Sequence, residues 1–305
     1  MIDRQQRIVQ NLALRAKILR LIRDYFTEQD FLEVDTPIRI PAPAPEPYIF
    51  PQPAGSWYLQ TSPELCMKRL LAAGFPKIFQ ICKCFRMEER GQRHLPEFTM
   101  LEWYEAGSTY TRLMERCEAL FDFIRKALNL PENLHYKGQA INLSTPWERL
   151  TVAGAFNRYA PISMDTAMRT GAFDETIAFD IEPNLGTSRP VFLYDYPAST
   201  CGLAAPKPEA PHLIERFELY IGGLELCNGF TELTDPVAQR RHFAAELENR
   251  RQNHLPSLPM PEKFLDDLHF MPPAAGNALG IDRLIMLFAG SESIDGVVAF
   301  TPEEL

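Results

Sequence analysis

The chain has 305 residues, 46% of them hydrophobic and 23% charged, with a formal net charge of −9. These values are ordinary for a soluble globular protein of one large or two small domains, and the acidic charge argues against broad, non-specific nucleic-acid binding. No apolar run approaches the roughly 18 residues of a membrane span, and the polar N-terminus MIDRQQRIVQ has no secretory apolar region. We therefore expect a cytoplasmic protein with no membrane partner, and the six scattered cysteines suit reduced thiols.

Hydrophobic periodicity predicts that amphipathic helices alternate with short strands. Apolar residues recur at three-to-four-residue steps over 4–29 and 111–128, which predicts a helix in each range. Further helices are expected over 61–74, 145–159, 236–251 and 264–270, and strands over 31–37, 57–60 and 191–197. The alternating prolines of 41–47 cannot pair in a sheet, so this segment is expected to be a stiff surface loop.

The stretch from Ile78 to Tyr104 has the pattern of two strands joined by a charged loop. In the second strand, period-two alternation places Phe98, Met100, Glu102 and Tyr104 on one face. The loop is longer than an ordinary hairpin turn and carries both charge signs. One interpretation is a solvated loop. The other is a nucleotide clamp, in which an arginine leaving the first strand grips a phosphate and an aromatic on the second stacks on a base.

A second informative stretch, 214–233, is typical of a β-hairpin with its turn at the glycine pair 222–223. That turn pairs Tyr220 with Glu225 and places Glu218 on the same face as Glu225, diagonally across the ladder. Two converging carboxylates repel unless a cation lies between them, and magnesium bridging phosphates is the natural candidate. A solvated hairpin face is the plain alternative.

The small residues of 276–280 indicate a strand or turn where another group approaches the backbone closely. A helix is expected to follow as far as residue 290, with Arg283 in its first turn. A glycine-rich turn is weak evidence alone, but here it accompanies an arginine and the two stretches above.

Together these stretches resemble the catalytic core of class II aminoacyl-tRNA synthetases, in the lysine-type form. FRME (85–88) and HLPEFTMLEWY (94–104) resemble motif 2, FLEVDTP (31–37) the end of motif 1, and GNALGIDRL (276–284) motif 3. ERFELY (215–220) is similar to the stretch before motif 3, and the order is kept along nearly the whole chain. The resemblance implies an α+β fold, with a mostly antiparallel sheet flanked by helices, and a homodimer paired through the motif 1 region.

The position of motif 1 bears on the domain organisation. Only one helix precedes it, which leaves no space for an anticodon-binding OB-fold of ~100 residues. We therefore expect one catalytic domain over 1–305 and no tRNA partner. The chain resembles the short branch of the family, also in TSPE, MKRLL, EPNLG and FELY. That resemblance implies ATP-dependent activation of a lysine, preferentially (R)-β-lysine, as the adenylate, and its attachment to a lysine of translation elongation factor P.

The resemblance also implies roles around ATP and Mg²⁺. As catalytic residues, Arg86 would hold the α-phosphate and Arg283 the γ-phosphate end of a bent ATP. Glu88 and Phe98 would take the adenine, by a hydrogen bond and by stacking. The remaining ATP-binding residues are His94, Glu225, Leu226 and Gly280, and Glu218 with Glu225 would hold magnesium.

The lysine substrate would be held mainly by carboxylates, because they make it possible to desolvate an ammonium group at low cost. Glu64 would meet the amine near the substrate's carboxyl group, and Glu102, Tyr104 and Glu232 its side-chain ammonium. Asn228 would orient the substrate carboxylate or a phosphate, and Ser62 and Ala278 complete the set.

Two positions depart from the usual family pattern. Ala278 stands where lysyl-tRNA synthetases usually have glycine, and we expect its methyl group to narrow the α-amino side and favour a β-amino isomer. Leu95 stands where an asparagine commonly contacts ATP, so one nucleotide contact is expected to be missing.

Two alternatives stay open from the sequence. The chain could be a free-standing lysine-activating enzyme that serves a tRNA, a carrier protein or a small molecule. It could also be a catalytically silent paralogue that binds lysine or ATP, which only Leu95 favours. The retained Arg86, Glu88, Glu218, Glu225 and Arg283 favour catalysis.

Overall fold

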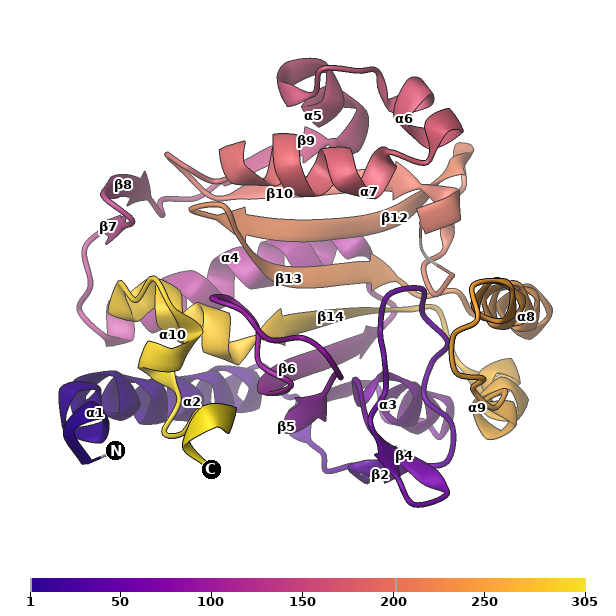
Figure 1. Cartoon of the computed structure of the whole chain (residues 1–305), viewed down its shortest axis with the longest axis horizontal. Helices are drawn as coiled ribbons and strands as arrows, with labels where there is room; N and C mark the ends of the chain where they lie inside the picture. Colours follow the sequence, from indigo (N-terminus) through magenta and orange to yellow (C-terminus); the bar gives the residue numbers. More distant parts are fainter. Residues whose placement is uncertain (1, 201) are drawn as a thin grey trace.

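The computed structural model describes residues 2–200 and 202–305, and a nine-stranded sheet forms its centre (Figure 1). The strands are β1 (Leu32–Glu33), β5 (Lys77–Phe85), β6 (Glu97–Ala106), β9 (Glu148–Thr151), β10 (Val191–Pro197), β11 (Pro206–Lys207), β12 (Ala210–Ile221), β13 (Leu224–Thr231) and β14 (Ala274–Gly280). They are ordered β1-β5-β6-β14-β13-β12-β10-β9, with β11 paired to β12. Only β1–β5 and β9–β10 pair in parallel, so the prediction of a mostly antiparallel sheet is confirmed.

Two smaller sheets and a set of helices surround this sheet. Strands β2 (Arg39–Ile40), β3 (Pro53–Ala54) and β4 (Trp57–Leu59) form one small sheet, and β7 (Asn133–Tyr136) with β8 (Gln139–Asn142) form a hairpin. The α-helices are α1 (Ile2–Arg7), α2 (Val9–Glu28), α3 (Glu64–Ala72), α4 (Tyr110–Ala127), α5 (Val152–Tyr159), α6 (Met164–Thr170), α7 (Phe173–Thr176), α8 (Pro236–Gln252), α9 (Glu262–Asp267) and α10 (Ile281–Ala289). A π-helical turn spans Ile177–Ile181, and short 3₁₀ segments are Glu182–Asn184, Ala198–Thr200, Leu268–Phe270, Ile294–Val297 and Pro302–Glu304.

Helices α2, α4 and α10 cover one face of the sheet and form the main core with it. The alternation along β6 sends Leu101 and Trp103 into this core, where both are fully buried beside Phe26 of α2. Burial of each such large apolar side chain contributes about 1.5–3 kcal/mol. This core therefore holds the sheet rigid behind its other face.

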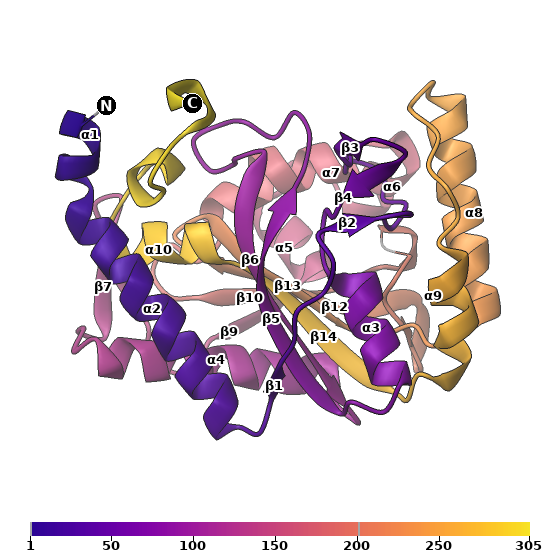
Figure 2. The same cartoon turned by 90° about the horizontal axis from the view of Figure 1, so that it is seen from below.

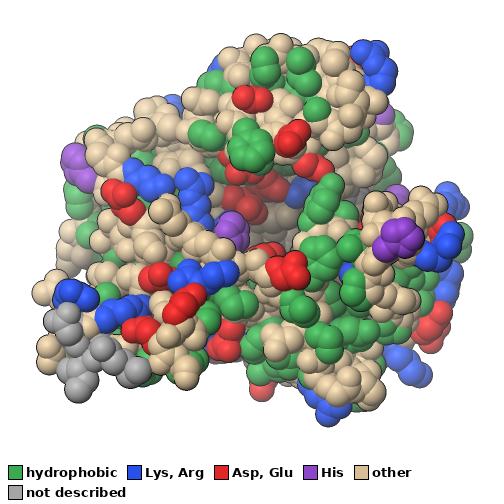
Figure 3. All heavy atoms as spheres, in the orientation of Figure 1, with side chains coloured by type: hydrophobic (Ala, Val, Ile, Leu, Met, Phe, Trp, Pro, Cys, Tyr) green, Lys and Arg blue, Asp and Glu red, His purple; other side chains and the backbone are tan. Residues whose placement is uncertain are grey.

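The opposite face of the sheet is only partly covered, by α3 with α8 and α9, while α5, α6 and α7 pack beside the edge formed by β9 and β10 (Figure 2). The space-filling view looks into a hollow at the middle of this side, where acidic side chains gather (Figure 3). Phe98, Met100, Glu102 and Tyr104 line a cavity on this face, as the period-two alternation predicted.

Most of the expected elements are confirmed, but the strand expected over 31–37 is only Leu32–Glu33, and two further expectations were at least partly wrong. The helix predicted over 145–159 begins only at Val152, because 148–151 pairs in parallel with β10 and Thr151 caps the helix through Gly154 N. The segment 41–47 is irregular as predicted and Pro41 and Pro47 are exposed, but it is not purely a surface loop, since Pro43 and Pro45 are buried and residues 45–47 line the cavity. The β7–β8 hairpin was not predicted.

The hairpin of β12 and β13 turns at the predicted glycine pair, and Tyr220 pairs with Glu225. Beyond that pair the register shifts, because Leu226 is an extra residue that forms a β-bulge. Glu218 consequently lies opposite Asn228 instead of one residue earlier. Glu225 lines the cavity, whereas Glu218 is buried and does not line it.

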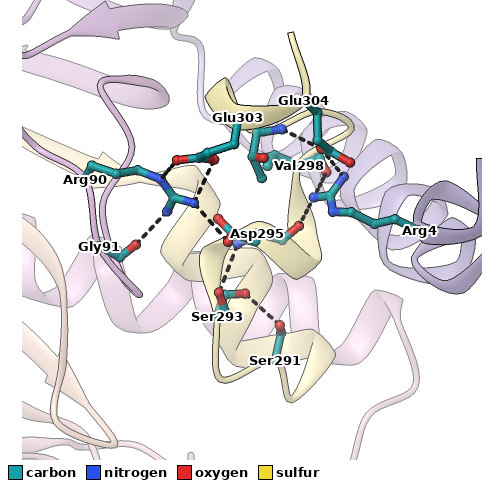
Figure 4. A network of polar contacts seen from close by, with 10 residues as sticks. Arg4, Arg90, Gly91, Ser291, Ser293, Asp295, Val298, Glu303 and Glu304 are labelled. Carbon is teal, nitrogen blue, oxygen red and sulfur yellow. Dashed lines mark hydrogen bonds and ion pairs between the residues drawn. The ribbon is translucent and has the colours of Figure 1, made fainter. Parts of the chain in front are cut away.

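The tip of the loop between β5 and β6 is tied to the C-terminal segment (Figure 4). Arg90 donates to Asp295 Oδ2 at 3.1 Å and to both carboxylate oxygens of Glu303. Glu304 forms an ion pair with Arg4 of α1 at 2.9 Å. The C-terminal segment thereby links the first helix to the charged loop that the sequence singled out.

Within residues 2–200 and 202–305, no helix is both long enough and apolar enough to cross a membrane.

Candidate active site

A cavity of about 610 Å³ lies on the open face of the sheet and collects most of the predicted site residues. Those that line it are Ser62, Glu64, Arg86, His94, Phe98, Glu102, Tyr104, Glu225, Leu226, Asn228, Ala278, Gly280 and Arg283. They come from α3 and the turn before it, β6, β13, β14, α10 and the loop that follows β5. Segments far apart in the sequence therefore meet at one site, as the order of the motifs led us to expect.

At one end of the cavity, two predicted ATP residues lie side by side. The guanidinium carbon of Arg86 is 5.1 Å from the centroid of the Phe98 ring, and its Nε donates to the Thr61 carbonyl at 3.4 Å. Glu89 forms a loose ion pair with Arg86 at 3.7 Å. The arginine is therefore directed into the cavity next to an aromatic ring, which is the arrangement of a phosphate-binding group beside a base-stacking group.

Arg283 occupies the predicted place in the first turn of α10. It donates to the Glu225 carbonyl at 2.9 Å and to its carboxylate at 3.1 Å. His94 Nε2 lies 2.5 Å from Arg283 Nη2. Burial together with the charges of Arg283, Arg86 and Arg93 lowers the pKa of His94 to about 4. His94 is therefore neutral at pH 7 and accepts a hydrogen bond from Arg283. The positive charge at this end of the cavity is carried by the arginines and not by His94.

At the other end, carboxylates converge around the predicted lysine pocket. Glu102 accepts hydrogen bonds from Ser62 Oγ at 2.6 Å and from the Tyr104 hydroxyl at 2.7 Å. Burial and the neighbouring charge of Glu64 raise the pKa of Glu102 to about 7. Gly276 forms the floor, because a Cβ there would lie 2.2 Å from Tyr104 and 2.6 Å from Glu232. The acids are thus packed tightly into a wall that has little tolerance for added volume.

Lys68 of α3 is a member of this site that the sequence did not single out. Its Nζ lies 2.5 Å from Glu64 Oε1 and 2.5 Å from Glu232 Oε2, and its side chain is 1% exposed. It also lies 5.1 Å from the Phe230 ring centroid. Burial opposes the charge of Lys68, but the two carboxylates outweigh burial and raise its pKa. Lys68 therefore stays charged and holds two acids of the pocket together.

Three predicted residues do not line the cavity. Glu232 is 3% exposed and lies behind the wall, where burial raises its pKa to about 8. Its Oε1 has no hydrogen-bond partner in the described part of the chain. Glu218 is also buried behind the wall, and Glu88 is exposed with a φ of 66°. Glu89, the next residue, lines the cavity in the place where Glu88 was expected.

Glu218 lies at the centre of a hydrogen-bonded group. It accepts from Arg216 Nη2 at 2.5 Å and from the hydroxyl groups of Tyr196 and Tyr220, each at 2.6 Å. The Tyr220 hydroxyl also contacts Glu182, whose pKa is raised to about 7 by burial and by the charges of Glu225 and Glu218. Negative charge therefore accumulates beside Glu225, and Glu182 is a further acid that the sequence did not indicate.

Leu95 is 4% exposed and belongs both to the cavity wall and to the main core. The position where the resemblance led us to expect an asparagine is thus occupied by an apolar side chain that packs against the core.

The sequence matches the family model described as tRNA synthetases class II (D, K and N) over residues 1–304. A protein named elongation factor P–(R)-β-lysine ligase from Pectobacterium carotovorum is 39% identical to this chain. The alignment is 315 positions long, gaps included, and covers 97% of this chain and 96% of the relative. Proteins of the same name from Edwardsiella ictaluri and Salmonella paratyphi B are 39% and 38% identical. Each alignment covers 96% of this chain and 95% of the relative.

Proposed function

The chain belongs to the class II (D, K and N) tRNA synthetase family, and on that basis we propose that it activates a lysine with ATP and transfers it to elongation factor P. The substrate is (R)-β-lysine by preference, and the acceptor is a lysine side chain of the factor. The names of the relatives support this acceptor. The observation that carries the proposal is a single cavity with arginines at one end and paired carboxylates at the other.

The carboxylate end suits an amino acid with two ammonium groups. Glu64 and Glu102 line the cavity, and Glu232 lies behind it with an unpaired oxygen. Lys68 offsets one negative charge, which leaves an excess of acid that a cationic substrate would compensate. An uncharged side chain would leave these buried acids without that partner, so the pocket selects lysine-like molecules.

The arginine end suits the triphosphate of ATP. In the first step the substrate carboxylate attacks the α-phosphorus in line and pyrophosphate leaves, while Arg86 offsets the charge that develops on the phosphate. Arg283 binds the far end of the phosphate chain, and Phe98 stacks on the adenine. No protein nucleophile is required. In the second step the amine of the acceptor attacks the mixed anhydride, and an amide forms.

Magnesium fits the acid cluster beside Glu225. Burial raises the pKa of Glu182, the negative charges of Glu225 and Glu218 raise it further, and a bound cation would offset these charges. No three His, Cys, Asp or Glu side chains in residues 2–200 and 202–305 are arranged to hold a metal alone. Magnesium characteristically takes one or two carboxylates and completes its coordination with phosphates and water. We propose that Glu225 and Glu218 hold it in this way, where it would neutralise phosphate charge.

A homodimer through the motif 1 region remains part of the proposal. Strand β1 ends the sheet, and Leu32 on it is 51% exposed. Val9 and Ile38 are 59% and 44% exposed. A bare edge with apolar side chains is commonly covered by a partner. Light scattering on Leu32→Glu should report monomers, whereas Val237→Glu on α8, also an exposed apolar position, should remain dimeric. A dimeric Leu32→Glu variant would contradict this interface.

The single-domain organisation over 1–305 and the cytoplasmic location stay predictions, and action on a translation factor supports the latter. The proposed activity is tested by ATP–pyrophosphate exchange with α-lysine and both enantiomers of β-lysine. Exchange that is fastest with (R)-β-lysine supports the proposal. If none of the three supports exchange, the chain does not activate lysine. If exchange occurs but elongation factor P gains no mass, the acceptor is wrong.

A further inference from the structure

Glu46 is an acid of the cleft that neither nucleotide binding nor lysine binding uses. It lies in the proline-rich segment 41–47, half-buried, and its side chain lines the active-site cavity together with Pro45 and Pro47. Among residues 2–200 and 202–305 its carboxylate has no hydrogen bond and no ion pair. The other acids of the pocket are engaged, because Glu102 and Glu64 both have close partners. Glu46 thus presents a free carboxylate to the cavity.

The segment that carries Glu46 is held in place from behind. Arg250 of α8 is 1% exposed, and its guanidinium donates to the Glu46 carbonyl at 3.1 Å and to the Ile49 carbonyl at 3.4 Å. The same guanidinium lies 5.6 Å from the Phe50 ring centroid. Prolines further restrict the backbone of the segment. The hydrogen bonds from this buried arginine to the two carbonyls fix the backbone that places Glu46 in the cavity wall.

Glu46 lines the same cavity as Glu64 of the carboxylate end and Arg86 of the arginine end. Glu64 and Lys68 of α3 act on it from the ammonium end, and Arg86 from the phosphate end. Arg216 of β12 acts on it from the sheet. In an aminoacyl-adenylate the carbonyl carbon lies between the amino group and the α-phosphate. Glu46 therefore shares the cavity with the residues proposed to hold the amino group and the α-phosphate, and the reactive carbonyl of the adenylate lies between these two groups.

The outer part of the cavity offers the acceptor a way in. The wall there is formed by the proline segment and by α8, which contributes His242, Glu246 and Asn249. An acceptor lysine that entered between these elements would pass Glu46 before it reached the carbonyl. Its amine arrives protonated, because the ordinary pKa of lysine is about 10.4. An ammonium group cannot attack a carbonyl, so the transfer step needs a proton acceptor at this point.

We propose that Glu46 is the general base of the transfer step, which takes a proton from the acceptor lysine as its amine attacks the adenylate. This inference rests on the proposed function. The Glu46 carboxylate removes one proton from the ammonium, and the nitrogen forms a bond to the carbonyl carbon. The bond from that carbon to the phosphate oxygen then breaks. The second proton of the nitrogen leaves with the phosphate oxygen of AMP, so the products are the amide, AMP and protonated Glu46, which returns its proton to water.

The electrostatics of the cleft suit this role. Burial and the nearby charge of Glu64 raise the pKa of Glu46 to about 7, and Arg86, Arg216 and Lys68 limit the rise. Glu246 and His242 of α8 face the same cavity. A base whose pKa lies near the working pH combines a useful fraction of the ionised form with a useful affinity for the proton. The unpaired side chain of Glu46, which lines the cavity, and its backbone, which Arg250 fixes, place the carboxylate where an incoming amine can reach it.

The test compares two acceptors on the enzyme-bound adenylate. One is elongation factor P, whose lysine must lose a proton, and the other is hydroxylamine, which is already uncharged at neutral pH. The variants are Glu46→Gln, Glu46→Asp and, as an exposed acid of α8 that does not line the cavity, Glu248→Gln. We expect Glu46→Gln to lower the rate of transfer to the factor, relative to hydroxylamine trapping, by roughly 10²-fold. Glu46→Asp should recover part of this loss, and Glu248→Gln should keep the wild-type ratio.

The pH profile separates a base from a structural or binding residue. Wild-type transfer should rise with pH and level off above about pH 7, where Glu46 is ionised. Glu46→Gln should lack this plateau and keep rising, because hydroxide or free amine replaces the base. An unchanged ratio of the two acceptors would overturn the proposal. So would a raised KM for lysine in pyrophosphate exchange without a change in that ratio, since Glu46 would then bind substrate.

Failure of the proposed function would look different. In that case the wild-type chain would form the hydroxamate but no product with elongation factor P. Nα-acetyl-lysine amide would then serve as the acceptor amine in the same comparison. A selective loss in Glu46→Gln would still support the base, and equal rates would overturn it.

Discussion

Replacement of Lys68 by methionine is the sharpest perturbation of the carboxylate pocket. The change keeps most of the side-chain volume and removes the charge that lies 2.5 Å from both Glu64 and Glu232. Removing one partner of a buried ion pair costs about 3–5 kcal/mol, because the remaining charge stays buried without compensation. We expect the free energy of unfolding in urea to fall by about this amount at pH 8.5.

The loss should depend on pH with a defined sign. Burial raises the pKa of Glu232 to about 8 and that of Glu102 to about 7. An acid whose pKa is raised in the folded state costs stability as the pH rises from its ordinary value to the folded value. At pH 6 both acids are mainly protonated, so Lys68 compensates only Glu64 and its removal costs less. The difference between wild type and Lys68→Met should therefore grow from pH 6 to pH 8.5.

Lys126 provides the control, because it also pairs with an acid four residues earlier, Asp122, at 2.6 Å. Its side chain is 68% exposed, against 1% for Lys68. Lys126→Met should cost less than about 1 kcal/mol at either pH. Equal losses for the two variants, or a Lys68→Met loss that does not change with pH, would refute the interpretation of Lys68 as the counter-ion of the pocket.

Three further predictions concern activity. Arg86→Ala should abolish pyrophosphate exchange, and wild-type rates would mean that the phosphate clamp is misassigned. Ala278→Gly should raise the use of α-lysine relative to β-lysine, because it removes a methyl group from the cavity wall opposite Glu102 on β6. An unchanged ratio of the two substrates would contradict the idea that this methyl group narrows the pocket. The KM for lysine in pyrophosphate exchange should fall between pH 6 and pH 8, because a bound ammonium favours the ionised forms of Glu102 and Glu232. The raised pKa values of these two acids are about 7 and 8. A KM that rises over this range would count against these acids as ammonium ligands.

The sequence was sufficient for the features that depend on local pattern. Period-two alternation assigned the cavity face of β6, and a glycine pair located the turn between β12 and β13. The β-bulge at Leu226 was out of reach, because nothing local distinguishes it from a regular strand residue. The burial of Glu218 was also out of reach, because it depends on Arg216, Tyr196 and Tyr220, which surround its carboxylate, so the two predicted metal ligands are not equally accessible.

Residues whose role depends on distant partners were missed. A lysine on an amphipathic helix normally faces solvent, but Lys68 is buried and pairs with Glu232, which follows β13 and is far from Lys68 in the sequence. A signal was present, since Lys68 follows Glu64 by four residues and precedes the buried Leu71 by three. Glu46 gave no such signal, because its place in the cavity depends on Arg250, about 200 residues later in the chain.

The most direct test of the central claim is the intact mass of elongation factor P after incubation with this chain, ATP, magnesium and (R)-β-lysine. The account predicts a gain of one lysyl residue on one lysine of the factor, and none when ATP is omitted or when Arg86→Ala replaces the wild-type chain. An unchanged mass with α-lysine and with both enantiomers of β-lysine, from enzyme that is active in pyrophosphate exchange, would contradict it.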